Sequence, residues 1–268
     1  MTNPERAVAV TLSRSELVLI AALLRARSMV GVEPLSGSEE QQALELLQAE
    51  RSLRARNAAT VTEEGKLLVV RDLLAAVGTC IYPERSLFVY HTRTDGVALQ
   101  AFGHQREELS IFHAVLNPEL HNIVQVPDAS GLIRLAFQIC SVADDLASAG
   151  LEVDLDRATL AGARQQAEQG ETAAAAATLA QAGAAPAAAE ALAAMLSREY
   201  TTSVFVTVAY QDGQAAGREY TLLQSGGAAL LMTQADQSSE RYQLRGIDRD
   251  GLLGLLLQSM NPLVPQPQ

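Results

Sequence analysis

The sequence carries one stretch twice, once in each half of the chain. Residues 86–96 read SLFVYHTRTDG, and residues 203–213 read SVFVTVAYQDG. Both stretches are rich in β-branched and aromatic residues, which favour strands. Both end in Asp-Gly, where glycine adopts the positive φ of a tight turn without a steric penalty. We therefore expect a β-hairpin at the same point of each half, and an internal duplication as its origin.

Two further pairs of segments match in the same order along the chain. They are LSRSEL (12–17) with LDRATL (155–160), and DASGLIRLAFQ (128–138) with DRDGLLGLLLQ (248–258). Each segment is typical of a helix start. Ser13 and Glu16 have the spacing of a capping box, and Asp156 is placed to cap the matching helix. Asp128 and Asp248 are expected to cap the last helix of each half, because a carboxylate accepts hydrogen bonds from the first helical turn.

The order of these signals predicts an α+β fold made of two like halves, residues 1–150 and 151–268. In each half we expect helices, an antiparallel four-stranded meander and a closing helix, with the helices packed on one face of the sheet. Each meander alone would leave an open edge and an apolar face. The halves are therefore expected to pair about a pseudo-twofold axis as one compact body.

Local patterns give approximate bounds for these elements. The first half should have a short strand or an extended lead at 7–11, helices near 13–28, 38–57 and 66–78, strands near 86–92, 97–104, 109–116 and 121–126, and a helix near 129–147. The second should have helices near 156–169, 171–182 and 186–198, strands near 201–210, 217–224, 227–234 and 240–246, and a helix near 249–259. The alanine-rich run 172–196 is interpreted as packed helices broken at Gly183 and Pro186. Residues 150–155 should connect the halves.

Charge and composition narrow the classes of function. The chain has 268 residues, 48% of them apolar, and a net charge of −11. A field of that sign repels nucleic-acid phosphates and anionic lipid. The apolar run at 17–24 is too short to span a bilayer, and two cysteines do not make a disulfide framework. We expect a cytoplasmic protein with a protein partner, and the sequence leaves self-association open.

Residue types that carry chemistry do not converge on a catalytic pattern. The four histidines, His91, His104, His113 and His121, fall within 31 residues. They lack the spacing of a zinc motif, so we interpret them as isolated residues near strand ends, with His113 facing the core. Cys140 is expected to be a small core residue, and Cys80 is not expected to be a nucleophile. We predict no enzymatic activity, no catalytic, metal-binding or cofactor-binding residue, and no cofactor.

Adjacent acids and glycines are assigned to turns and solvated surfaces. The acid pairs are Glu39-Glu40, Glu63-Glu64, Glu107-Glu108 and Asp144-Asp145. Neighbouring carboxylates on a helix point in different directions, and those beside turns are usually solvated. Gly226-Gly227 has neither the lysine nor the following helix of a phosphate loop, so it is expected to be a hairpin turn.

One segment favours a different function. Residues 43–67 read as a helix, a short turn and a small wing, and the chain's densest basic cluster is Arg51, Arg54, Arg56, Lys66 and Arg71. A winged helix at about 38–71 would place such residues on DNA phosphates. Interleaved glutamates favour the alternative of a surface helix with ion pairs between neighbouring turns. The DNA-associated regulator is kept as the alternative to a protein-binding function.

The order of elements resembles that of the EspG family of type VII secretion chaperones. The resemblance rests on LSRSEL, the helix–turn segment 43–67, SLFVYHTRTDG and the Asp-x-x-Gly-Leu start of each closing helix. It implies a cytosolic, non-enzymatic protein with a pseudo-twofold α+β fold that binds the tip of a helical PE–PPE pair and keeps it soluble. The family has no catalytic motif, so the resemblance assigns no site residue, and the sequence does not define the partner-binding surface.

Overall fold

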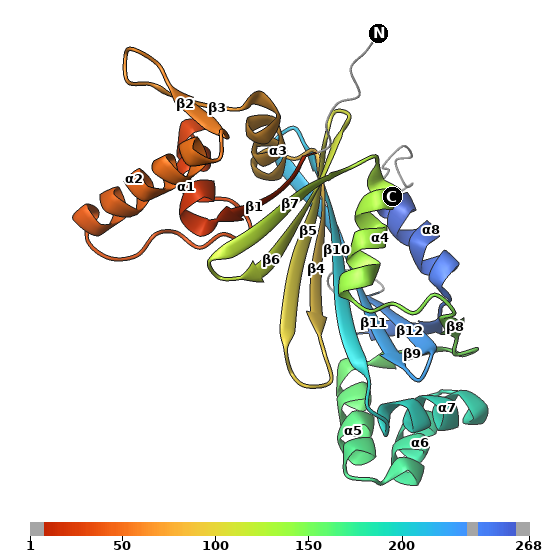
Figure 1. The fold of residues 1–268 in the computed structure, drawn as a ribbon. Helices are drawn as coiled ribbons and strands as arrows, with labels where there is room; N and C mark the ends of the chain where they lie inside the picture. The colour runs from red at the N-terminus through yellow and green to blue at the C-terminus, as the bar shows by residue number, and fades with distance from the viewer. Residues whose placement is uncertain (1–7, 235–240, 261–268) are drawn as a thin grey trace. The chain divides into compact units, whose positions relative to one another are not determined.

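The computed structural model describes residues 8–234 and 241–260 (Figure 1). The chain divides into two compact units. The first unit comprises Met1–Leu87, Gln100–Ala136 and Val208–Ala216, and the second comprises Phe88–Leu99, Phe137–Thr207 and Gly217–Gln268. Several strands contribute residues to both units, so these units differ from the predicted halves. The division into halves at residue 150 stays a prediction.

The elements follow the predicted alternation of helices and meanders. Those of the first part of the chain are β1 (Ala9–Ser13), α1 (Arg14–Leu23), α2 (Glu39–Ala55), β2 (Ala59–Val61), β3 (Leu67–Val69), α3 (Arg71–Ile81), β4 (Arg85–Thr92), β5 (Ala98–Arg106), β6 (Leu109–Asn117), β7 (Leu120–Val126) and α4 (Ala129–Ile139). The rest are β8 (Ala147–Ser148), β9 (Glu152–Asp156), α5 (Arg157–Glu168), α6 (Thr172–Gln181), α7 (Pro186–Leu196), β10 (Thr201–Gln211), β11 (Gln214–Ser225), β12 (Ala228–Gln234), β13 (Arg241–Gly246) and α8 (Arg249–Met260). The α+β class and the two four-stranded meanders, β4–β7 and β10–β13, are confirmed.

Within each unit the strands pair in a comparable order. The first unit has the order β1-β7-β6-β5, and the second has the order β9-β13-β12-β11, with β8 parallel to β12. In both, a strand that precedes a capped helix pairs with the last strand of a meander. Ser13 lies opposite Leu120, and Asp156 lies opposite Arg241. A duplication would produce this correspondence, but a common origin of the halves stays a prediction.

The predicted helix caps and turns are present. Ser13 Oγ accepts the Glu16 N–H at 3.2 Å, and Glu16 Oε2 accepts the Ser13 N–H at 2.8 Å, which completes the capping box. Asp128, Asp156 and Asp248 each accept a backbone N–H three residues ahead, at 2.7 to 2.9 Å. The Asp-Gly turns adopt positive φ at Gly96, Asp212 and Gly213, and the Gly226-Gly227 turn does so at both glycines.

We expect Ser13→Ala to lower the free energy of unfolding by about 1 kcal/mol, because it removes one half of the capping box of α1. Urea unfolding followed by circular dichroism measures this change. Ser52→Ala is the matched control, since Ser52 is exposed in the interior of α2. A loss no larger than that of the control would show that the cap contributes nothing measurable.

The core of the first unit lies between its sheet and the helices α1 and α3. Leu12, Ile111 and Ile123 from the sheet pack with Leu17 and Ile20 of α1 and with a further set of buried residues. That set is Met29, Leu53, Ala59, Leu73, Ala76, Val77 and Cys80. Only Ala49 and Leu53 of α2 are buried, so most of that helix faces solvent.

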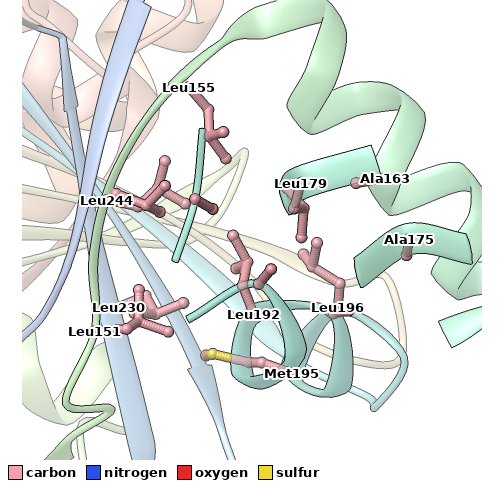
Figure 2. Packing of buried hydrophobic residues seen from close by; sticks show 14 of the residues in the cluster. Leu151, Leu155, Ala163, Ala175, Leu179, Leu192, Met195, Leu196, Leu230 and Leu244 are labelled. Atoms are coloured by element: carbon pink, nitrogen blue, oxygen red, sulfur yellow. The ribbon is translucent and has the colours of Figure 1, made fainter. Parts of the chain in front are cut away.

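The core of the second unit is built largely from its alanine-rich helices (Figure 2). Leu179 of α6 and Leu192 and Leu196 of α7 pack with Leu230 and Leu244 of the sheet. Buried alanines at 163, 167, 175, 189 and 193 let the helices approach closely. The helices break around Gly183, whose φ is +104°, and α7 begins at Pro186. The interpretation of residues 172–196 as packed helices is confirmed.

Several predicted bounds are wrong for local reasons. The helix expected to reach residue 28 ends at Leu23, because Arg25 takes a positive φ of 58°. The helix expected at 66–78 is instead β3 followed by α3, since the leucines and valines of 67–70 pair in a hairpin with β2. The helix expected to reach 147 ends at Ile139, and Ser141 has a φ of 49°. The expected connection at 150–155 contains β9, which pairs with β13.

Candidate partner-binding surfaces

The residues considered for catalysis lie in the protein interior. Cys80 and Cys140 are both 1% exposed. Burial raises the pKa of the Cys80 thiol far above its ordinary value, and burial raises that of Cys140 to about 12 despite a hydrogen bond with Ser203. Both thiols are therefore protonated and shielded from solvent. Across residues 8–234 and 241–260, no group of three or more histidine, cysteine, aspartate or glutamate side chains could hold a metal ion.

The histidines are not isolated, which corrects the sequence interpretation. All four are at most 1% exposed. His113 Nε2 lies 2.9 Å from His121 Nδ1, His104 Nδ1 lies 2.9 Å from Ser86 Oγ, and His91 Nδ1 lies 2.9 Å from Ser203 Oγ. These contacts depend on strand pairing between distant residues, and the spacing of the histidines along the chain gave no signal for them.

The acid pairs and the glycine pair lie where the sequence placed them. Every member of the four acid pairs is exposed, in the first turn of α2, in two hairpin turns and in the segment after α4. Gly226-Gly227 joins β11 to β12 and is a hairpin turn, as predicted. The exposure of the acid pairs agrees with their interpretation as solvated surface residues.

The basic segment forms a helix and a hairpin, as the winged-helix alternative requires, but most of its charge is neutralised. Arg54 pairs with Glu50 at 3.2 Å, and Lys66 pairs with Glu64 at 2.7 Å. Arg56 pairs with the buried Glu16 and donates to the Thr11 carbonyl. These ion pairs reduce the positive charge that the segment offers to phosphate.

Exposed apolar side chains concentrate in one part of the first unit. Thirteen large apolar residues are exposed in the described part of the chain, and eight of them lie between residues 23 and 82. Leu44 and Leu47 lie on α2, and Val61, Leu68 and Val70 lie on or beside the β2–β3 hairpin. We call these five residues the helix–hairpin surface; Figure 1 shows the helix and hairpin that carry them. Exposed apolar residues of this kind mark a protein contact site where they form a continuous patch.

The second unit has at least three concave features, and two of them lie on or beside its helices α5, α6 and α7. A groove of about 480 Å³ is lined mainly by alanines of α6 and by Pro186 and Ala189 of α7. A cleft of about 400 Å³ includes Arg93, Arg164 and Arg198. Arg164 donates to Glu168 at 2.7 Å and lies over the Tyr200 ring, 5.6 Å from its centroid. The groove is lined mainly by small apolar side chains, whereas the cleft is lined by polar side chains and by charged side chains of both signs.

The helix–hairpin surface was not predicted from the sequence. One signal was available in α2, where Leu44, Leu46, Leu47 and Leu53 are spread around more than one face of the helix. A single buried face cannot take all of them. The leucines at 44 and 47 are consequently left in solvent, with 54% and 41% of their surface exposed.

Comparison with known proteins defines the fold. No family profile matches the chain, and no curated protein sequence does. Among solved structures, the chain is similar to the Mycobacterium tuberculosis type VII secretion system chaperone EspG5, solved in complex with a PE25–PPE41 dimer. The TM-score is 0.68 at 13% sequence identity, over 97% of this chain and 98% of that one. The chain therefore has an EspG-like fold, as the resemblance predicted.

The structure also bears on membrane association. Among the helices of the described residues, none combines the length and the apolar character needed to cross a bilayer.

Proposed function

We propose that this protein is a non-enzymatic cytoplasmic chaperone that binds a helical partner of the PE–PPE type. The observation that supports this function most is the likeness to EspG5 over almost the whole length of both chains. EspG5 was solved with a PE25–PPE41 dimer bound. Because the likeness covers both chains almost completely, no large part of the neighbour's fold is without a counterpart here.

The exposed surface supports the same proposal. Full burial of an exposed leucine side chain contributes about 1.5–3 kcal/mol. The leucines of the helix–hairpin surface are 41–54% exposed, so each would contribute roughly half of that amount when an apolar helical tip covers it. The net charge of −11 keeps a protein with this much exposed apolar surface soluble. We place the partner contact on the helix–hairpin surface.

The proposal is tested by capture and reconstitution. The tagged full chain is used to capture partners from its native cell, and each captured helical pair is then co-expressed with the chain. We expect a stable complex of defined stoichiometry in size-exclusion chromatography with light scattering. Failure of every captured pair to form a complex with the purified chain, or salt-sensitive retention of DNA alone, would contradict the proposal.

Substitution of Leu44 and Leu68 by aspartate should weaken partner binding by at least about tenfold, because each change puts a charge into the proposed apolar contact. The amount of co-expressed pair that co-purifies with the tagged variant, relative to the unsubstituted chain, measures the effect. Leu116→Asp is the matched control, since Leu116 is equally exposed but lies at the end of β6 outside the surface. Equal affinities for the double variant and the control would remove the contact from this surface.

A further inference from the structure

A buried pair of imidazoles lies in the core of the first unit. His113 Nε2 and His121 Nδ1 are 2.9 Å apart, and their ring centroids are 5.1 Å apart. Both residues are at most 1% exposed. Neutral imidazole has one donor and one acceptor nitrogen, so the bond between these two rings requires that at least one of them be neutral.

The pair belongs to the face of the sheet that the helices cover. His113 lies opposite Phe102 and Ile123 on the neighbouring strands, and His121 lies opposite Leu12 of β1. Leu12 and Ile123 are core residues that pack with α1 and α3. The Phe102 ring lies 5.4 Å from the His113 ring and 6.3 Å from the His104 ring. The histidines therefore lie in the layer where the sheet meets its helical cover.

The surroundings disfavour a charged imidazole. Burial lowers the pKa of His113 to about 3, with smaller contributions from His121 and His104, and burial lowers that of His104 to about 4. Burial also lowers the pKa of His121; Glu119 and the Pro118 backbone oppose this, and Arg14 adds to it. The buried or nearby charged and titratable groups on the packed elements are Arg14 and Glu16 of α1, Cys80 of α3, His104 of β5 and Glu119 of the β6–β7 turn; Arg71 and Asp72 of α3 and Arg106 of β5 are exposed.

Both nearby carboxylates already have cationic partners. Glu119 is exposed and pairs with Arg14 at 3.2 Å, while Glu16 pairs with Arg56. A proton added to the histidine pair would thus place a positive charge in an apolar layer without a free counter-ion. Two added protons would also abolish the hydrogen bond, because both ring nitrogens would then be donors.

We propose that the His113–His121 pair is an acid-sensitive latch, whose protonation loosens the contact between the sheet of the first unit and its helices α1 and α3. The sign follows from proton binding. In the open state, in which α1 and α3 have loosened from the sheet, the two histidines take up protons near their ordinary pKa of about 6.5. In the closed state they do so only at lower pH. The closed state therefore loses stability relative to the open state as the pH falls below about 6.5. Each histidine that is neutral in the closed state and protonated in the open state shifts the equilibrium toward the open state about tenfold for each pH unit below this value.

The latch has a consequence for partner binding that rests on the proposed function. Leu53 of α2 and Ala59 of β2 belong to the same core as α1 and α3. Loosening of this layer would therefore disturb the elements that carry the helix–hairpin surface, and partner affinity should fall with pH. The latch itself can be tested without any partner.

Hydrogen exchange of the full chain at pH 7.5, 6.0 and 5.0, corrected for intrinsic exchange rates, tests the latch. We expect peptides from α1, α3, β6 and β7 to lose protection by at least about tenfold between pH 7.5 and 5.0. Peptides from the helices of the second unit should change less. The double variant His113→Gln/His121→Gln keeps hydrogen-bonding groups but does not titrate, so it should show a flatter pH profile.

Two further measurements keep the proposal falsifiable if the double variant folds poorly. The ring resonances of the histidines in the wild-type chain can be titrated directly by NMR. His91→Gln, which changes a histidine of the second unit, is the matched control and should leave the pH profile of α1 and α3 unchanged. Ring signals of His113 and His121 that titrate near pH 6.5, with no loss of hydrogen-exchange protection in α1 and α3, would overturn the latch. An acid-induced loss of protection in the double variant equal to that of the wild-type chain would also overturn it.

Discussion

Replacement of Gly31 by alanine is expected to lower the free energy of unfolding by about 3 kcal/mol. Gly31 has a φ of +75°, a conformation that costs a residue with a Cβ about 1–2 kcal/mol. A Cβ at this position would also clash with Cε2 of Phe102, a buried ring. Overpacking of this kind typically costs a further 1–3 kcal/mol. Urea unfolding, monitored by hydrogen exchange in the first unit, measures the loss.

Gly65→Ala separates the two causes. Gly65 has nearly the same φ, +78°, but a Cβ there would meet nothing within 4 Å. We therefore expect Gly65→Ala to cost only the backbone term, about 1 kcal/mol. Equal losses for the two variants would show that the close approach of Gly31 to Phe102 contributes nothing to stability, and that Gly31 does not lie against the Phe102 ring.

Leu192→Ala is expected to destabilise the second unit by about 3 kcal/mol. Leu192 is fully buried in the cluster where α7 packs on α6 and the sheet (Figure 2). Its truncation removes buried surface and leaves a cavity, and substitutions of this type cost 2–5 kcal/mol. Thermal unfolding with local readout by hydrogen exchange checks the value.

Leu47→Ala is the surface control for this prediction. Leu47 is 41% exposed and lies on α2, so the same chemical change should alter the free energy of unfolding by less than about 0.5 kcal/mol. A loss below 1 kcal/mol for Leu192→Ala would contradict the packing of the alanine-rich helices against the sheet of the second unit.

The meanders could be predicted from the sequence because their signals are local. Strand bounds within β4–β7 and β10–β13 follow from runs of β-branched and aromatic residues that end in glycine turns such as Gly96 and Gly227. The helix starts follow from Ser13 and Asp156, whose side chains bond to backbone groups three residues away. Interactions over so few residues leave a readable pattern in the sequence.

Features that depend on distant pairing could not be predicted. The segment β9, expected only as a connection, becomes a strand because it pairs with β13, more than eighty residues away along the chain. The extended segment expected at 7–11 is β1, but its pairing with β7 could not be predicted. The contact of His113 with His121 depends on the register of β6 against β7. The exposure of Leu44 likewise depends on which face of α2 meets α1, and a helix with so weak an apolar face does not define that choice.

The proposed function depends most on whether the chain keeps a helical protein soluble. The direct measurement is the soluble fraction of a reconstituted partner pair expressed with the chain, without it, and with the Leu44→Asp/Leu68→Asp variant. We predict a soluble complex that contains the chain and both partner subunits, and aggregation of the pair when the chain is absent or carries both substitutions. Equal solubility of the pair under all three conditions, with no complex in light scattering, would contradict the chaperone function.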